Sequence, residues 1–177
     1  MNEYKNVMLI SPNKLKSFGV MNINVDDSML SNCIRISQNI HLVDIIGQDL
    51  VNRLQELVYG KITGSGETID DFPQYKDLLD EYVLPVLAYR TAVEMAVVNN
   101  LKIRNMGTIK NSDINVNQTS SDEYKYLSNY YNTYFYDAVN KMVAFLCENK
   151  NVFPESKIDC TCSTKPLYAN TNLWLGK

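Results

Sequence analysis

The fold is decided by residues 73–104, whose sequence is PQYKDLLDEYVLPVLAYRTAVEMAVVNNLKIR. Its apolar side chains recur every three or four residues, which is the period of an α-helix. Pro73 suits the first turn of this predicted helix, and Gly107 ends it. Between residues 83 and 98 the helix is apolar nearly all round, so we expect it to be covered on several sides.

Pro85 lies inside this predicted helix. A proline there removes one helical hydrogen bond and clashes with the carbonyl of the residue four positions earlier, Glu81. We therefore expect a kink or a short break near Pro85.

A second long helix is predicted downstream of this one. Ser120 and Glu123 have the spacing of a capping box, and the helix is expected to end near residues 148–150, before Pro154. Its apolar stripe, spaced alternately by three and four residues, consists of Tyr124, Leu127, Tyr131, Tyr134, Ala138, Met142 and Phe145.

Shorter helices are predicted upstream, near residues 28–40 after an N-cap at Asp26 or Asp27, and near residues 48–58. The stretch from His41 to Gly47 breaks the helical pattern. The sequence thus predicts an all-α protein, a bundle of about four to five helices with one kinked long helix.

The predicted helices occupy the middle of the chain. Residues 26–150 form the expected helical domain, residues 1–25 an N-terminal arm, and residues 151–177 an extended C-terminal tail. Residues 108–119 are polar with scattered Ile and Val, which is compatible with either a loop or a weak hairpin.

Composition and charge exclude several classes of protein. The 177 residues suit one domain, and 17 basic against 20 acidic side chains give a net charge of −3. A stand-alone nucleic-acid-binding protein would normally be basic. The sequence contains neither 18 consecutive apolar residues nor the apolar core of a signal peptide, so we expect a protein made in a cytoplasm that does not span a membrane.

Four cysteines in that compartment are expected to be reduced thiols. Cys33 and Cys147 lie within helical patterns and are interpreted as small core residues. Cys160 and Cys162 form an isolated C-x-C, and a zinc site needs about four ligands, so free thiols are the favoured interpretation.

Motifs of catalysis or metal binding are not evident. His41 is the only histidine and has no nucleophile motif beside it. The acidic pairs near Asp70 and Asp77 lack the ligand spacing of a calcium loop and suit helix starts. We expect no catalytic residues, no cofactor and no metal.

Two sets of side chains are candidates for contact with other chains. Tyr126 and Tyr130 lie off the predicted core stripe of the last long helix. A base-stacking platform is the alternative, but basic residues are few there. In the tail, Tyr168, Leu173, Trp174 and Leu175 are expected to anchor a partner chain, the alternative being that the tail folds back on its own core.

Short motifs along residues 20–150, with the order and lengths of the predicted helices, resemble those of a known family. The motifs are Asn24-Val25-Asp26, Cys33-Ile34, Ser37-Gln38-Asn39-Ile40-His41-Leu42, Ile45-Ile46-Gly47-Gln48-Asp49-Leu50, Tyr75-Lys76-Asp77-Leu78-Leu79, Tyr82-Val83-Leu84-Pro85-Val86-Leu87-Ala88-Tyr89 and Asn105-Met106-Gly107. The family is that of the head-to-tail adaptors, or connectors, of tailed bacteriophages, and the similarity is greatest to the ring proteins of crAss-like phages.

This resemblance implies a structural virion protein at the head–tail junction, assembled in the host cytoplasm. It implies a ring, typically of twelve copies, that contacts the portal protein or adjacent tail rings and lets DNA pass through its lumen without specific binding. It implies no catalysis. A modest negative charge suits such a conduit, because a lumen that bound phosphates tightly would arrest the duplex.

The residues leave other functions open. A cytoplasmic helical interaction module or regulator, binding a peptide in a groove, is the main alternative. A small enzyme would require a pocket that holds His41 with a carboxylate. A DNA-binding regulator would require tight, salt-sensitive duplex binding.

Overall fold

The computed structural model describes residues 3–104, 107–110 and 121–160 of the chain. It confirms the predicted all-α class. The elements in chain order are η1 (Glu3–Asn6), α1 (Pro12–Ser17), α2 (Asp27–Ile36), η2 (Ser37–Leu42), α3 (Val43–Ile46), α4 (Gln48–Thr63), η3 (Ile69–Asp71), α5 (Pro73–Asp77), η4 (Leu78–Val83), α6 (Leu84–Asn100), β1 (Leu101–Arg104), β2 (Gly107–Lys110) and α7 (Ser121–Glu148).

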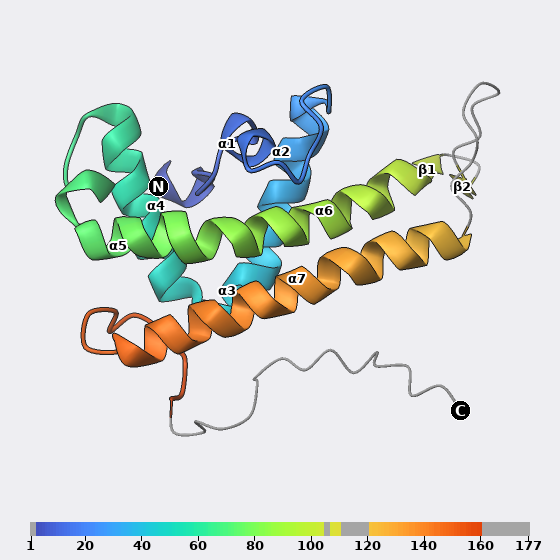
Figure 1. Cartoon of the computed structure of the whole chain (residues 1–177). Helices are drawn as coiled ribbons and strands as arrows, with labels where there is room; N and C mark the ends of the chain where they lie inside the picture. Colours follow the sequence, from blue (N-terminus) through green and yellow to red (C-terminus); the bar gives the residue numbers. More distant parts are fainter. Residues whose placement is uncertain (1–2, 105–106, 111–120, 161–177) are drawn as a thin grey trace, which may run out of the picture.

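The two long helices α6 and α7 lie side by side, and α2 packs on α6 (Figure 1). α5 (Pro73–Asp77) runs on through η4 into α6 as one rod, and α4 packs on η1 and η3. The core between these helices contains fully buried Leu54, Leu87 and Met142. As predicted, α6 is covered on several sides, since Leu84, Val86, Leu87 and Ala88 are all at most 8% exposed.

The chain accommodates Pro85 without a break. α5, η4 and α6 follow one another directly, and η4 is a π-helical turn that ends two residues before Pro85. A π-helical turn bonds each N–H to the fifth carbonyl back, which widens the helix where a proline would otherwise clash with Glu81. The predicted distortion is therefore present, in the form of a wider turn.

The predicted interruption from His41 to Gly47 is wrong. Helical structure continues from α2 through the π-helical turn η2 and α3 as far as Ile46. Leu42 and Ile46 lie eight and twelve residues after Ile34, a spacing that would turn them away from the core in a regular α-helix of about 3.6 residues per turn; the wider turn keeps them buried. Gly47, with φ of +95°, then ends the helix.

The predicted end of the long helix at Arg104 is also wrong. α6 ends at Asn100, and residues 101–104 form strand β1, which pairs antiparallel with β2. Leu101 lies opposite Lys110 and Arg104 opposite Gly107. Of the two alternatives for residues 108–119, a hairpin strand is found as far as Lys110, and residues 111–119 lie outside the described part of the chain.

The N-terminal segment is part of the core, which corrects the prediction of an arm. Leu9, Ile10 and Leu15 are at most 5% exposed. Two buried glutamines bind its backbone: Gln38 accepts from the Leu9 N–H at 2.8 Å, and Gln55 donates to the carbonyl oxygens of Lys5 and Val7 at 3.0 and 2.8 Å.

Residues 151–160 also pack on the core, although an extended tail was expected from residue 151 onward. Phe153 is 1% exposed, and its ring lies 5.0 Å from that of Tyr75. The Lys157 N–H donates to the Ile46 carbonyl at 3.1 Å, and the Lys157 side chain crosses Gly47. A side chain at position 47 would meet Lys157 in addition to straining the backbone.

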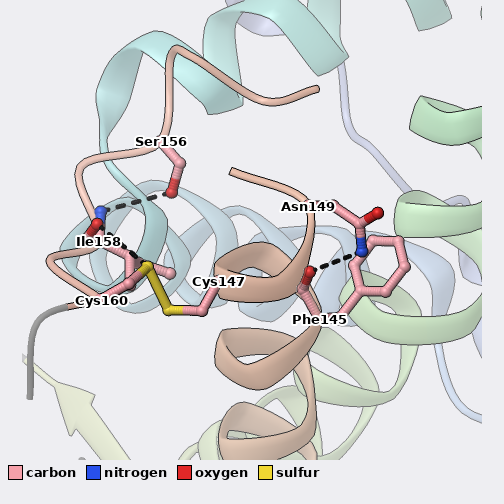
Figure 2. The surroundings of a disulfide bond; sticks show 6 residues. All are labelled: Phe145, Cys147, Asn149, Ser156, Ile158 and Cys160. Carbon is pink, nitrogen blue, oxygen red and sulfur yellow. Dashed lines mark hydrogen bonds between the residues drawn. A yellow bond between two sulfur atoms is a disulfide. The ribbon is translucent and has the colours of Figure 1, made fainter. Parts of the chain in front are cut away.

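A disulfide joins Cys147, near the end of α7, to Cys160 (Figure 2). The prediction of reduced thiols is therefore wrong for these two cysteines. The sequence could not show the pairing, because it depends on the turn of residues 149–158 that brings the chain back to α7. Cys33 is free and buried, as predicted, and Cys162 lies outside the described residues.

Candidate functional site: an aromatic surface on α7

Helix α7 presents different surfaces along its length. Its second half contributes Phe135, Val139, Met142 and Leu146 to the core, each at most 6% exposed. Its first half leaves large side chains in solvent, with Tyr126 73%, Tyr130 46%, Tyr134 41% and Leu127 39% exposed. We refer to these four exposed residues as the aromatic face.

The aromatic face continues onto α6 and the segment after α1 through ring contacts. Tyr130 and Tyr134 meet at 4.9 Å between ring centroids, and Tyr134 stacks on Tyr89 at 5.4 Å. Tyr89 in turn contacts the edge of Phe18 at 5.8 Å. Such ring contacts hold the side chains in place and reduce the conformational entropy that a partner would have to remove on binding.

A groove of about 250 Å³ runs beside these rings, between η4 with α6 on one wall and α7 on the other. It is lined by Phe18, Glu81, Tyr82, Pro85, Tyr89, Tyr134, Asp137, Ala138 and Lys141. An aromatic groove of this size suits a few side chains of a peptide.

The polar edge of the groove carries two carboxylates, Glu81 and Asp137. Lys141 forms an ion pair with Asp137 at 2.7 Å, which raises the pKa of Lys141. A hydrogen bond between the Tyr130 and Tyr134 hydroxyls raises the pKa of Tyr130. Two carboxylates and one ammonium group leave the edge of the groove with a net negative charge.

The structure places the predicted contact residues in two groups. Tyr126 and Tyr130 are exposed on α7, as the interface prediction requires. Tyr168, Leu173, Trp174 and Leu175 lie outside the described residues.

Sequence reasoning missed the groove itself. The predicted stripe of α7 is confirmed at Ala138 and Met142, which are buried, and is wrong at Leu127 and Tyr134, which are exposed. Phe135 and Val139, next to predicted positions, are buried as well, and the period alone could not show which neighbouring positions face the core. The high density of tyrosines before residue 137 was the available signal that this part of the helix is not core.

His41 does not contact the groove. Its Nε2 lies 3.3 Å from Glu94, and Arg90 donates to the same carboxylate at 2.6 Å. Burial and the Arg90 cation lower the pKa of His41 despite Glu94. The three side chains join η2 to α6, where Thr91 also donates to Ser37 at 3.2 Å.

The buried thiol of Cys33 is a further group that could react, and its surroundings do not activate it. Burial, with Glu94 nearby, raises the pKa of Cys33 to about 11, so its thiol stays protonated. Within the described residues, groups of three or more side chains suited to holding a metal ion are absent. None of the described helices is long and apolar enough to cross a membrane.

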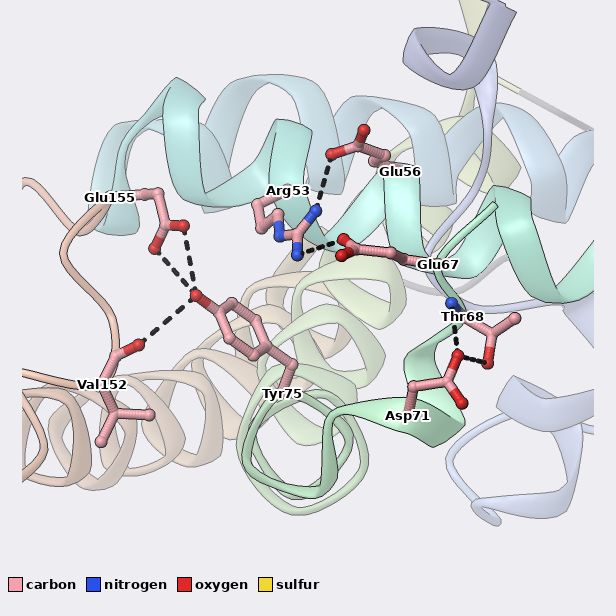
Figure 3. Close-up of polar contacts among 8 residues, drawn as sticks. All are labelled: Arg53, Glu56, Glu67, Thr68, Asp71, Tyr75, Val152 and Glu155. Carbon is pink, nitrogen blue, oxygen red and sulfur yellow. Dashed lines mark hydrogen bonds and ion pairs between the residues drawn. The ribbon is translucent and has the colours of Figure 1, made fainter. Parts of the chain in front are cut away.

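Figure 3 shows separate groups of polar contacts, one around Arg53 of α4 and one that joins Tyr75 of α5 to the segment after α7; the Arg53 guanidinium lies over the Tyr75 ring, 6.0 Å from its centroid. Arg53 pairs with Glu56 at 3.0 Å and Glu67 at 2.7 Å, while the Tyr75 hydroxyl contacts Glu155 at 3.0 Å.

The acidic pair of residues 70 and 71 lies at a helix start, as predicted. Asp71 and Thr68 form a capping box around η3. Hydrogen bonds from Lys61 and Lys76 lower the pKa of Asp70 to about 2.

The fold and the surface define a class of protein. It is an all-α domain whose core is covered by the segment before α2 and the segment after α7, and whose aromatic face is exposed to solvent. Residues 42–166, more than half of the chain, match the model of a family described as a family of unknown function, DUF6712, and the chain belongs to it. A comparison with curated proteins finds no match, and a comparison with solved structures finds none either.

Proposed function

We propose that the chain is a structural protein of a tailed-bacteriophage virion. In this proposal it is a head-to-tail adaptor whose copies form a ring, joining the portal to the tail and letting DNA pass. The observation that carries the proposal is the aromatic face, because exposed tyrosines on a helix that completes its own core favour packing against another chain. The resemblance of the motifs in residues 20–150 to the adaptor family supports the same conclusion.

The packing of the segments before α2 and after α7 reduces the set of residues that could anchor a partner chain. Leu9, Ile10, Leu15 and Phe153 pack on their own core, so these side chains are not available to a neighbour. The anchoring role falls to Tyr168, Leu173, Trp174 and Leu175. The side-to-side contacts of the ring fall to the aromatic face.

The disulfide also suits this function. Disulfides persist outside reducing cytoplasm, including on virions. A protein that is assembled in a cell and then released in a particle enters such surroundings. Cys147 and Cys160 would then stay bonded in the mature particle.

The decisive experiment asks where the protein ends up. The chain is tagged in its native genome, particles are purified on a density gradient, and its copies per particle are counted by quantitative mass spectrometry. We expect it to sediment with particles, at about twelve copies for each portal vertex. A chain found only in the soluble fraction of the lysate would overturn the proposal and favour the cytoplasmic interaction module.

DNA binding provides a second check. An acidic conduit predicts weak duplex binding by the purified chain, with little change between low and moderate salt. Tight binding that falls steeply with salt would contradict the conduit and support a DNA-binding regulator.

A further inference from the structure

We infer that the groove between α6 and α7 binds the C-terminal segment of a second copy of this chain, residues 165–175. The inference rests on the proposed function, because it names the partner that the aromatic surface would take in a ring. Four observations carry it: the lining of the groove, its charge, the composition of the segment, and the place where the segment leaves the fold.

The lining of the groove matches the apolar residues of the segment. Tyr82, Tyr89 and Tyr134 form its aromatic wall together with Pro85. Grooves lined by aromatic rings bind extended peptides that contain proline, because such peptides lose little entropy on binding. Residues 165–175 begin with Lys-Pro-Leu-Tyr and end with Leu-Trp-Leu.

The charges are complementary. Glu81 and Asp137 contribute two carboxylates to the groove, and only Lys141 among its lining residues is basic. Residues 161–177 contain Lys165 and Lys177 and no acidic side chain. A basic residue next to Pro166 would therefore lie near the acidic edge when the proline contacts the rings.

The position of Cys160, after which the segment begins, favours binding to the groove of a second copy over binding to the groove of the same molecule. Cys160 is bonded to Cys147, with their Cα atoms 5.4 Å apart. Cys147 follows the groove residue Ala138 by nine positions, or about 2.5 helical turns, so the two lie on opposite sides of α7. Cys160, the last described residue before the segment, therefore lies on the side of α7 opposite Ala138.

A ring formed by rotation brings together two different surfaces of neighbouring copies. The groove side of α7 and the Cys147 side are such a pair. Residues 161–166 span at most about 20 Å. The path to the molecule's own groove must first pass around α7, and a neighbouring copy whose groove faces Cys160 would not require that detour.

Trp174 allows a direct test, because it is the only tryptophan in the chain. The donor is the full chain carrying Tyr134→Ser, which damages its own groove and keeps Trp174. The acceptor is the full chain carrying Trp174→Phe, which is invisible in tryptophan fluorescence and keeps the groove. Titrating donor with acceptor should shift the Trp174 emission to shorter wavelength in a saturable way.

Matched acceptor variants distinguish binding in the groove from nonspecific association. An acceptor that also carries Glu81→Lys should bind the donor about fivefold more weakly. A donor that also carries Lys165→Glu should recover that loss with this acceptor. An acceptor with Ala144→Ser, exposed on α7 but outside both the groove and the aromatic face, should bind like the parent acceptor, and circular dichroism checks that every variant is folded.

Two results would overturn the inference. One is an unchanged Trp174 emission at every acceptor concentration. The other is a short-wavelength emission of the wild-type chain that does not depend on its concentration, which would place the segment on its own molecule. The localisation experiment is independent: a chain that sediments with particles but shows no docking retains the adaptor function and loses this inference.

Discussion

Before α2 the chain is held to the core by buried Leu9, Ile10 and Leu15 and by hydrogen bonds from two glutamines, whereas after α7 it is held by an aromatic side chain and a covalent bond. Gln38 and Gln55 bind the backbone near Val7 and Leu9 from within the core. Phe153 fills the core at the other end, and Cys160 closes a loop onto α7. The contrast shows that one core can hold its two ends by unlike chemistry, and the two ends should fail under different conditions.

The largest effect is expected at the C-terminal end, from Phe153→Ala. Removing this buried ring leaves a cavity beside Tyr75 and Phe145 and should lower the free energy of unfolding by about 3–5 kcal/mol. Urea denaturation followed by circular dichroism measures it. Val152→Ala, next to it and 38% exposed, should cost less than about 0.5 kcal/mol. Equal effects of the two variants would show that the segment is not part of the core.

The second largest loss of stability is expected from removal of the disulfide. Cys147→Ser releases the loop that ends at Cys160 and should lower the free energy of unfolding by about 2–3 kcal/mol without reductant. A reducing agent should lower the stability of the wild type by a similar amount and leave the variant unchanged. A wild type that does not respond to reductant would refute this attachment.

At the N-terminal end, Gln55→Ala should cost about 1–3 kcal/mol, because it removes the side-chain donor to the Lys5 carbonyl and one of the two donors to the Val7 carbonyl, the other being Gln38. Hydrogen exchange should speed up first at the N-terminal segment, with residues 151–160 still protected. Gln48→Ala, on the exposed side of α4, is the matched control and should be close to neutral. Faster exchange at both ends together would mean that they are not held separately.

The smallest effect at neutral pH is expected from Tyr75→Phe, about 1 kcal/mol for the lost contact with Glu155. Burial, with a hydrogen bond to Glu155, raises the pKa of Tyr75 to about 12, from an ordinary value of 10. The folded state therefore keeps this proton after the unfolded state has lost it. The resulting stability is complete below pH 10 and is lost as the pH rises toward 12.

Denaturation curves between pH 9 and 12 test this dependence. Tyr75→Phe should flatten the fall in stability over that range, and Tyr126→Phe, on the exposed part of α7, should not. A Tyr75→Phe variant with the slope of the wild type would assign the alkaline loss to other groups.

Much of the helical scaffold could be predicted from the sequence. The capping box at Ser120 placed the start of α7 within one residue, and Pro85 located the distortion before α6. These signals work because caps and prolines act on the backbone locally, whatever the rest of the chain does.

The attachments of the two ends could not be predicted in this way. α1 has only six residues, which is too short for a period, although Leu15 is fully buried. Gln38 and Gln55 are polar residues that belong to the core only because the N-terminal backbone supplies their partners. The groove depends on which side of α7 faces α6, and that choice is made by packing across the whole bundle.

The contact between Gln55 and Val7 joins residues 48 positions apart in the chain. A ribosome that adds about 5–20 residues per second needs roughly 2–10 s to make the intervening stretch. Throughout that interval the Lys5 carbonyl lacks the Gln55 side chain that binds it in the folded protein, although Gln38 is made before Gln55 and can bind Leu9 and Val7. The backbone around Lys5 is therefore made early and fixed late, after α4 has emerged.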